Sequence, residues 1–131
     1  MIDQRTRIMN AHTRSKTAVV YARVSSKDQE REGFSIPAQQ KLLHQYARQQ
    51  GFRVVREFID VETAKQAGRT RFGEMIAFLT TDRTCRHVLV EKTDRLYRNI
   101  RDWITVENLD VTVHFVKEGA VVSHASRSSD K

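Results

Sequence analysis

Residues 18–24 read AVVYARV, and this stretch decides the fold. It is almost continuously apolar and rich in residues that favour β-strands. A strand that is covered on both faces, as in a parallel sheet, has this kind of sequence. We therefore expect residues 18–24 to form a buried strand, with Arg23 as its one charged residue.

Further along the chain, segments with strand character alternate with segments of helical spacing. This alternation is typical of a mostly parallel sheet flanked by helices, so we expect an α/β fold with four to five strands. After the first strand we expect a helix from Ser35 to Gly51, a strand at 53–60 and a polar loop at 61–68. A second helix is built on Phe72, Met75, Ile76 and Leu79, and a strand follows at 87–90. We expect a third helix from Asp94 to about Asn108, with Leu96, Ile100, Trp103 and Ile104 on its buried side, and then strands at 111–116 and 120–122.

Length and composition restrict the class of protein. The chain has 131 residues, which suits one domain of the usual size of about 100–200 residues. No apolar run approaches the roughly 18 residues of a membrane-spanning helix. Residues 1–16 are basic but lack an apolar core, so we do not expect them to act as a signal peptide. The single cysteine, Cys85, excludes a disulfide scaffold and a cysteine-based zinc site. We expect a cytoplasmic protein with no membrane contact.

The charge indicates a polyanionic partner. Lys and Arg number 23 against 16 Asp and Glu, which gives a net charge of +7. Residues 1–16 carry +3 from four bases and one acid, and residues 83–101 carry +4 from six bases and two acids. The excess is therefore concentrated in one terminal arm and one interior segment.

Arg23 and Ser25 come at the end of the first strand. The functional site of a parallel sheet lies outside the carboxyl ends of its strands. A half-buried guanidinium needs an anionic partner, so Arg23 is either a salt-bridge residue or an anion ligand. Ser25 is either a turn former or a nucleophile that needs a base or cationic surroundings.

A basic segment follows the strand at 87–90. In the helix expected from Asp94, the side chains of Asp94, Arg98 and Arg101 fall opposite the apolar stripe, with Arg95 at the flank. A capping residue at this helix start would lie where an anion is favoured. The ordinary alternative is an N-cap aspartate followed by a solvated basic face.

Arg69 and Arg71 come at the start of the helix built on Phe72, where they are either phosphate ligands or solvated charges. Together the three strand ends bring a hydroxyl, a carboxylate and at least four arginines to one edge. Because carboxylates are few there, arginine rather than Mg²⁺ would stabilise the charge of phosphoryl transfer. The residues predict metal-free transfer of a nucleic-acid phosphate to serine.

Five sequence blocks, in this order, resemble those of the serine recombinases, the family of resolvases, invertases and large serine integrases. The resemblance covers residues 17 to about 124 and is closest to the large integrases. The blocks are YARVSS at 21–26 with Asp28 and Gln29, GFSIPAQ at 33–39, AGR at 67–69 with Phe72 and Met75, TDRLYR at 93–98, and VHFV at 113–116 with EG at 118–119.

The resemblance implies a mechanism and a set of site residues. Ser25 would attack a DNA phosphate to give a 5′-phosphoserine and a free 3′-hydroxyl, which later reseals the DNA. Asp94 would orient an arginine or transfer a proton, and Gln29 and Gln39 would support the site. No metal or cofactor is implied, and DNA is the partner. The arginines that would bind the scissile phosphate are Arg23, Arg69, Arg95 and Arg98, with Arg69 preferred to Arg71 because of its Ala-Gly-Arg context.

The same resemblance gives a domain division. We expect a flexible basic arm at 1–16, the catalytic domain at 17–124 and a polar end at 125–131, where the family's long dimer helix would begin. We expect the chain alone to be inactive and to bind DNA weakly, since the family's DNA-binding region is missing. In a complete protein it would form a dimer and a synaptic tetramer, associated with the nucleoid.

Two other classes of function stay open at this point. The first is a truncated, non-catalytic domain that associates with DNA or regulates a partner. The second is a receiver-like phosphate-binding domain, which needs an acidic cluster at the end of its first strand. Arg23-Val24-Ser25 stands in that place and counts against it.

Overall fold

The structure is a computed structural model that describes residues 16–25, 35–62 and 69–123. The predicted arm at 1–16, apart from Lys16, and the end at 125–131 lie outside the described residues, as does Gln29. Within the described ranges no helix is long and apolar enough to cross a membrane. The elements are β1 (Thr17–Ser25), α3 (Ile36–Gln50), β2 (Arg53–Glu62), α4 (Thr70–Thr81), β3 (His87–Val90), α5 (Thr93–Leu96), α6 (Ile100–Glu107), β4 (Thr112–Phe115), the 3₁₀ turn η1 (Val116–Glu118) and β5 (Ala120–Ser123).

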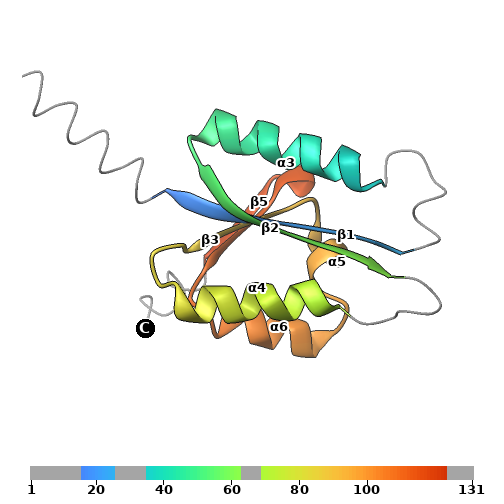
Figure 1. Ribbon diagram of the computed structural model, residues 1–131, viewed down its shortest axis with the longest axis vertical. Helices are drawn as coiled ribbons and strands as arrows, with labels where there is room; N and C mark the ends of the chain where they lie inside the picture. Colours follow the sequence, from blue (N-terminus) through green and yellow to red (C-terminus); the bar gives the residue numbers. More distant parts are fainter. Residues whose placement is uncertain (1–15, 26–34, 63–68, 124–131) are drawn as a thin grey trace, which may run out of the picture.

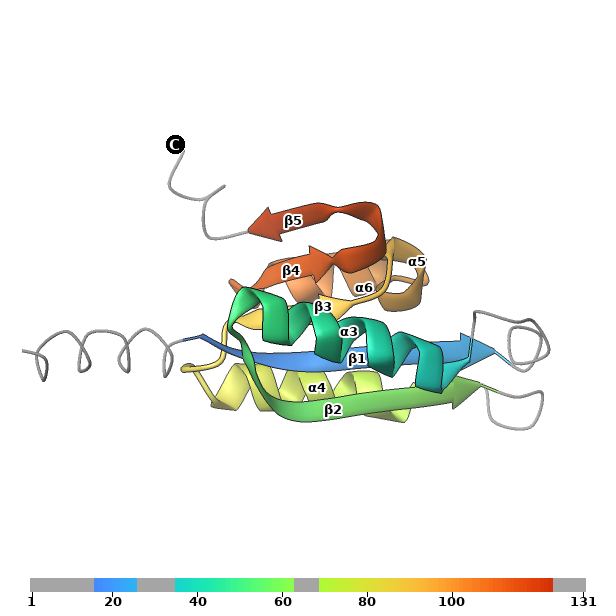
Figure 2. The same cartoon turned by 90° about the horizontal axis from the view of Figure 1, so that it is seen from above.

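Five strands form one sheet in the order β2-β1-β3-β4-β5. The first four run parallel to one another, and β5 runs antiparallel to β4 at one edge. Helix α3 covers one face, and α4 and α6 cover the other (Figure 1). Figure 2 shows β1 and β2 ending side by side, beyond the helices that cover them. The predicted α/β fold with a mostly parallel sheet is confirmed.

Strand β1 is buried on both faces, as its sequence predicts. Val19 and Tyr21 pack into the core beneath α4 and α6, whereas Ala18 and Val20 pack into the smaller core beneath α3. Successive side chains of a strand point to opposite faces. A strand between two layers of helices therefore needs apolar residues at consecutive positions.

Helix α3 begins and ends where the sequence predicts. Ser35 Oγ accepts a hydrogen bond from the backbone N–H of Ala38, and Pro37 occupies the first turn. Gly51 ends the helix with φ 78°, the left-handed conformation that glycine adopts without strain. Its N–H donates to the last carbonyls of the helix.

The single helix expected from Asp94 to Asn108 is wrong, because the structure has two short helices, α5 and α6. Tyr97 is extended, and Asn99 starts α6 by accepting a hydrogen bond from Asp102 N–H at 3.0 Å. The predicted buried stripe is broken by this restart. Leu96 is buried, but Ile100 and Ile104 are 74% and 49% exposed.

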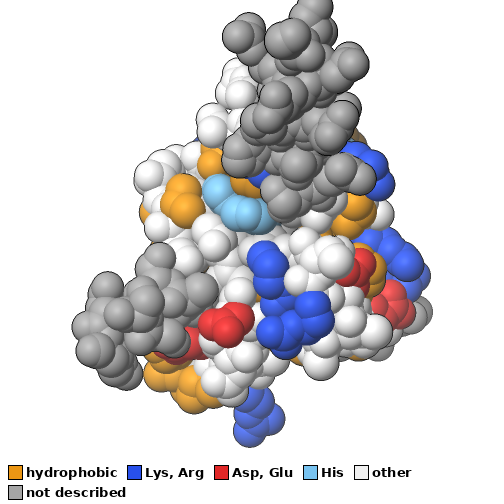
Figure 3. Space-filling view, turned by 90° about the vertical axis from the view of Figure 1, so that its left-hand side faces the viewer, with side chains coloured by type: hydrophobic (Ala, Val, Ile, Leu, Met, Phe, Trp, Pro, Cys, Tyr) orange, Lys and Arg blue, Asp and Glu red, His pale blue; other side chains and the backbone are white. Residues whose placement is uncertain are grey.

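A histidine cluster lies at the amino ends of the strands, beneath the second half of α3. His114 contacts His87 (Nε2 to Nδ1, 3.1 Å) and Tyr46 (Nδ1 to Oη, 2.8 Å). Both rings also pack against Phe52. Burial lowers the pKa of His87, and it lowers that of His114 to about 4, so both rings are neutral at pH 7. Figure 3 shows this end of the molecule, where a patch of histidine surface lies with Lys and Arg side chains below it and to its right.

Candidate functional site

Ser25 is the last residue of β1, at the carboxyl end of the sheet. In the parallel pairing of β1 with β2, it lies opposite Glu62, the last residue of β2. Arg23 lies two residues before Ser25 and opposite Asp60. Because alternate residues of a strand share a face, these four residues lie in two adjacent rows on one face.

Arg23 is held by the chain on three sides. Its Nη1 donates to Glu62 Oε1 at 2.6 Å, its Nε donates to the carbonyl of Arg95 at 3.1 Å, and its Nη2 donates to the carbonyl of Asp94. The fully buried Gln39 holds the Arg23 backbone, accepting from its N–H at 3.2 Å and donating to its carbonyl at 3.1 Å. The guanidinium position is therefore set by α3, α5 and β2 together.

Arg98 reaches the same carboxylate as Arg23. Its Nη1 lies 2.8 Å from Glu62 Oε2, while Arg23 takes Oε1. Glu62 is buried, whereas Arg98 is exposed in the break between α5 and α6. The two arginines thus converge on one anion beside Ser25, although they are 75 positions apart in the sequence.

Arg69 belongs to a neighbouring group. Its Nη1 pairs with Asp102 at 2.5 Å, and its Nη2 donates to the Leu96 carbonyl at 2.7 Å and to Tyr21 Oη at 3.1 Å. The guanidinium is only 6% exposed and lies over the Phe72 ring, 4.0 Å from its centre. Asp102 also accepts the Arg98 backbone N–H at 2.8 Å, which joins this group to the Glu62 group.

Asp60 and Tyr21 connect the sheet to the start of α4. The Asp60 carboxylate accepts the backbone N–H groups of Arg71 and Phe72 at 3.0 and 2.9 Å, and the Tyr21 hydroxyl at 2.7 Å. A carboxylate at a helix N-terminus is stabilised by the free N–H groups there. Burial raises the pKa of the Tyr21 phenol, and its hydrogen bond to Asp60 raises it further.

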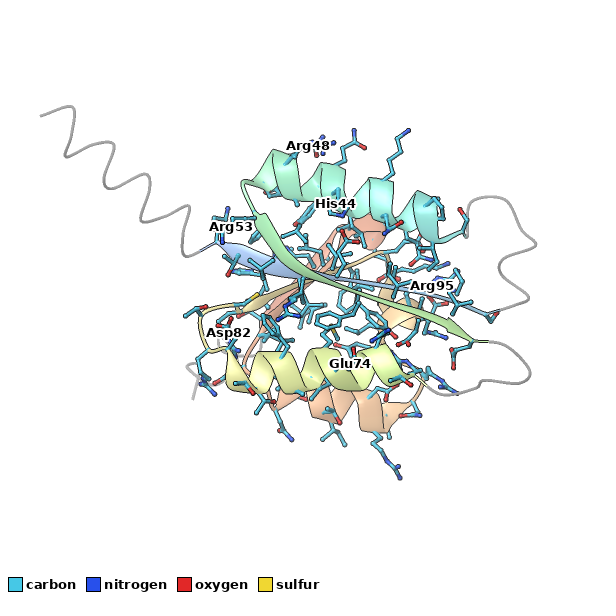
Figure 4. The ribbon with its side chains drawn as sticks, viewed as in Figure 1. His44, Arg48, Arg53, Glu74, Asp82 and Arg95 are labelled. Atoms are coloured by element: carbon cyan, nitrogen blue, oxygen red, sulfur yellow. The ribbon has the colours of Figure 1, made fainter. Side chains whose placement is uncertain are left out.

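Asp94 is exposed, as expected for a residue opposite the apolar stripe, but Arg95 does not lie as expected. Asp94 meets Arg23 through its backbone carbonyl. Arg95 is buried and lies 3.4 Å from Glu91, which is also 3.7 Å from Lys117. Figure 4 labels Arg95 at the site end of the sheet, away from Arg53 at the other end. The sequence pattern placed Arg95 at the flank of one long helix. This is wrong, because α5 is a single short turn and Arg95 is buried.

The expectation of few carboxylates at this edge is also wrong. Each of the four arginines has an acidic partner: Glu62 for Arg23 and Arg98, Asp102 for Arg69, and Glu91 for Arg95. Half-buried guanidiniums need such partners in an unliganded protein. Glu62 ends β2, Glu91 directly follows β3 and Asp102 lies in the first turn of α6. Only Glu91 belongs to a segment that the sequence indicated for the site, and its pairing with Arg95 was not predicted.

The structure brings Ser25, Arg23, Arg98, Gln39 and the Asp94–Arg95 backbone to one end of the sheet, with Arg69 beside them. Sequence reasoning missed the acids that organise this end. A signal for Glu62 was its spacing of two from Asp60, which puts both on one face if the strand continues. Among the described residues, no group of three or more His, Cys, Asp or Glu is suited to hold a metal ion.

Comparison with known proteins identifies the family. The model of the resolvase N-terminal domain matches residues 18–130. The N-terminal catalytic domain of TP901-1 integrase is similar in structure, with a TM-score of 0.70, 28% identity and 88% of each chain covered. The C-terminal catalytic domain of ISC1926 TnpA, an IS607-like serine recombinase, gives a TM-score of 0.62 and 28% identity over 87% of this chain and 76% of that one.

A resolvase-family site-specific recombinase from Streptococcus pneumoniae has the same fold, with a TM-score of 0.69 and 22% identity over 87% of this chain and 86% of that chain. No curated protein sequence gives a significant match. The family match extends over most of the chain, and the order of strands and helices agrees with it. The chain therefore belongs to the family of resolvase N-terminal domains and is the catalytic domain of a serine-type site-specific recombinase.

Proposed function

We propose that this domain cleaves and rejoins DNA with Ser25 as its nucleophile. The observation that carries the proposal is the convergence of Arg23 and Arg98 on one carboxylate in the row adjacent to Ser25. Arginine binds carboxylate and phosphate through the same donor geometry. Two guanidiniums that meet one carboxylate are therefore spaced to bind one phosphate.

The reaction is a transfer between two oxygen atoms. Ser25 Oγ bonds to phosphorus while the bond from phosphorus to the 3′ oxygen breaks. The serine loses its proton, and the departing 3′ oxygen gains one, which leaves a 5′-phosphoserine and a 3′-hydroxyl. In the reverse step a 3′-hydroxyl attacks the phosphoserine and restores both the phosphodiester and the serine.

The arginines stabilise the charge that develops on the equatorial phosphate oxygens. Arg23 and Arg98 share Glu62, the residue paired with Ser25, and Arg69 and Arg95 complete the proposed set. Gln39 is a positioning residue, because it acts through the Arg23 backbone. Gln29 and the carboxylate of Asp94 are assigned from the resemblance, Asp94 for orientation or proton transfer.

The substrate is DNA, in the cytoplasm at the nucleoid, and the exchange of strands takes place between dimers that form a tetramer. The similar structures are named as an integrase, an IS607-like serine recombinase and a resolvase-family site-specific recombinase. We take residues 17–124 as the unit that carries the chemistry. A non-catalytic DNA-associated domain would share the basic surface but would form no covalent bond to DNA.

The test is a covalent protein–DNA adduct. The chain is fused to a dimeric DNA-binding module of known site, incubated with duplexes labelled on either strand end, and analysed under denaturing conditions. We expect protein attached to a 5′ end, and loss of that adduct in Ser25→Ala.

The matched control is Ser123→Ala, which removes a hydroxyl from the opposite end of the sheet, where Ser123 pairs with Thr112. This variant keeps the adduct. If the unchanged fusion occupies its site and forms no adduct on any strand, the proposal is wrong and the non-catalytic class is favoured.

A further inference from the structure

Glu62 occupies the place where two guanidiniums meet. One oxygen of its carboxylate takes Arg23 at 2.6 Å and the other takes Arg98 at 2.8 Å. A phosphodiester also presents two unesterified oxygens on one centre and carries one negative charge. In shape and in charge, the Glu62 carboxylate thus stands in for a phosphate group.

The register of the sheet explains why Glu62 is beside the nucleophile. Glu62 and Ser25 are paired positions at the ends of β2 and β1. Glu62 is buried, and both oxygens of its carboxylate form ion pairs, one with Arg23 and one with Arg98.

Arg23 has anchors that do not depend on Glu62. Its Nε and Nη2 donate to the carbonyls of Arg95 and Asp94, and Gln39 holds its backbone. If the Glu62 carboxylate moves away, these contacts keep the guanidinium at the end of β1. Its Nη1 is then directed at the place that the carboxylate has left.

We infer that Glu62 is a resident competitor of the DNA phosphate, which keeps the Arg23–Arg98 anion site filled until a phosphodiester displaces it. The inference rests on the proposed function, since it concerns the same two arginines. A second anion cannot join Glu62 at this site without like-charge repulsion, which is costly in a partly buried place. Binding of the phosphate and release of Glu62 are therefore one exchange.

The exchange serves the domain in two ways. In the free protein the carboxylate offsets the repulsion between two partly buried guanidiniums and stabilises the fold. On DNA the same carboxylate lowers the affinity for any phosphate that is not held in place by other contacts. Cleavage is thereby restricted to DNA whose other contacts hold the phosphate in place well enough for it to displace Glu62.

The experiment compares Glu62→Gln with the unchanged chain. The probe is a fluorescent duplex, and the dissociation constant is measured by anisotropy at several salt concentrations. We expect Glu62→Gln to bind about fivefold more tightly at low salt, because the phosphate then gains its charge-assisted contacts to Arg23 and Arg98 without displacing a carboxylate. The slope of log affinity against log salt should steepen by about 0.9, the value of one added phosphate contact.

Glu74→Gln is the matched control. Glu74 is exposed and pairs with Arg71 at 2.7 Å on α4, so this change alters net charge equally and also frees an arginine. It should change affinity less than twofold and leave the salt slope unaltered. If Glu62→Gln binds no more tightly than Glu74→Gln, including the case in which neither binds, the inference is overturned.

Glu62→Asp covers the case in which the glutamine variant does not fold. Its carboxylate keeps the charge but is one methylene shorter, so it releases one of the two arginines, and affinity should rise by about twofold. Equal affinity to the unchanged chain overturns the inference. An adduct at Ser25 without any gain from Glu62 variants overturns only this inference, whereas a gain without an adduct overturns only the proposed chemistry.

Discussion

The two ends of the sheet differ in how their ionisable side chains are accommodated. At the carboxyl end, Arg23, Arg69 and Arg98 are each paired with a carboxylate. At the amino end, His87 and His114 lie against each other and stay neutral, because burial lowers the pKa of both. Each end satisfies its buried polar groups, but by a different means.

This difference determines which end can bind an anion. A guanidinium paired with a carboxylate can exchange that partner for a phosphate, since both partners carry negative charge. A neutral histidine pair has no such partner to exchange, and both ring nitrogens of His114 are already used in contacts to His87 and to Tyr46. The location of the site follows from the kind of pairing, as well as from the direction of the strands.

The largest predicted effect comes from breaking a pair at the carboxyl end. Asp102→Ala leaves the Arg69 guanidinium without its acid at a place that is 6% exposed. Loss of one partner of a buried pair costs several kcal/mol, so we expect the free energy of unfolding to fall by about 3 kcal/mol in urea titrations. Glu74→Ala breaks an exposed pair and should cost less than about 0.5 kcal/mol. Equal losses would show that the Arg69 pair is no different from a surface pair.

The next effect concerns the support of Arg23. Gln39→Ala removes both partners of the Arg23 backbone and leaves a small cavity, which we expect to cost about 2 kcal/mol. Gln40→Ala removes only an exposed contact to Glu57 and should cost less than about 0.5 kcal/mol. Thermal unfolding of the two variants measures the difference. A tolerated Gln39→Ala would mean that α3 does not hold this end of the site.

At the amino end of the sheet, we expect the free energy of unfolding to depend on pH through His114. The folded-state pKa of His114 is about 4, below the ordinary value of 6.5, so the unfolded chain binds the proton first as pH falls. Stability is then fully present above pH 6.5 and declines toward pH 4. Between pH 7 and pH 5 we expect a loss on the order of 1 kcal/mol, after allowance for screening by solvent.

His114→Asn should remove most of that decline. The comparison is made between the variant and the unchanged chain at each pH, so that any change common to both proteins cancels. His87 and Lys16 are the other charged or titratable groups that affect His114. Parallel pH profiles of the two proteins would mean that the histidine pair does not set the decline.

The smallest effect is expected on α6. Ile100→Gln changes an exposed side chain and should alter the free energy of unfolding by less than about 0.5 kcal/mol, whereas the buried Val106→Ala should cost about 2 kcal/mol. Chemical denaturation of the two variants checks this. A large loss in Ile100→Gln would mean that this side chain, and not the polar contacts of Asn99 and Asp102, holds the start of α6.

Local patterns were sufficient to predict much of the fold. The apolar run of β1 and the caps of α3 act within a few residues, so their sequence predicts the elements directly. The break at Asn99 was missed because an N-cap inside a helical pattern looks like an ordinary polar position. Glu62 was missed because a two-residue extension of β2 turned a predicted loop residue into the partner of Ser25.

The charge pairs could not be predicted, since they depend on which strand ends meet in space. Arg23 and Glu62 are 39 positions apart and are joined by the register of β1 and β2. The sequence indicated which residue types would gather at the edge, and the roles of Ser25 and its arginines remain proposals. The sequence pattern did not show how many acidic residues would pair with these arginines.

The contact between Arg23 and the backbone of residues 94 and 95 can be used in engineering. Arg23 is anchored by the main-chain carbonyls of residues 94 and 95, and a carbonyl is present whatever the side chain. Random mutagenesis of codon 94 can therefore vary charge and size at this end of the sheet without deleting the anchor, while Arg95 keeps its place among the proposed phosphate ligands. A library at position 94 would sample new proton donors on an unaltered arginine frame, and it offers a direct route to recombinases with a changed pH optimum.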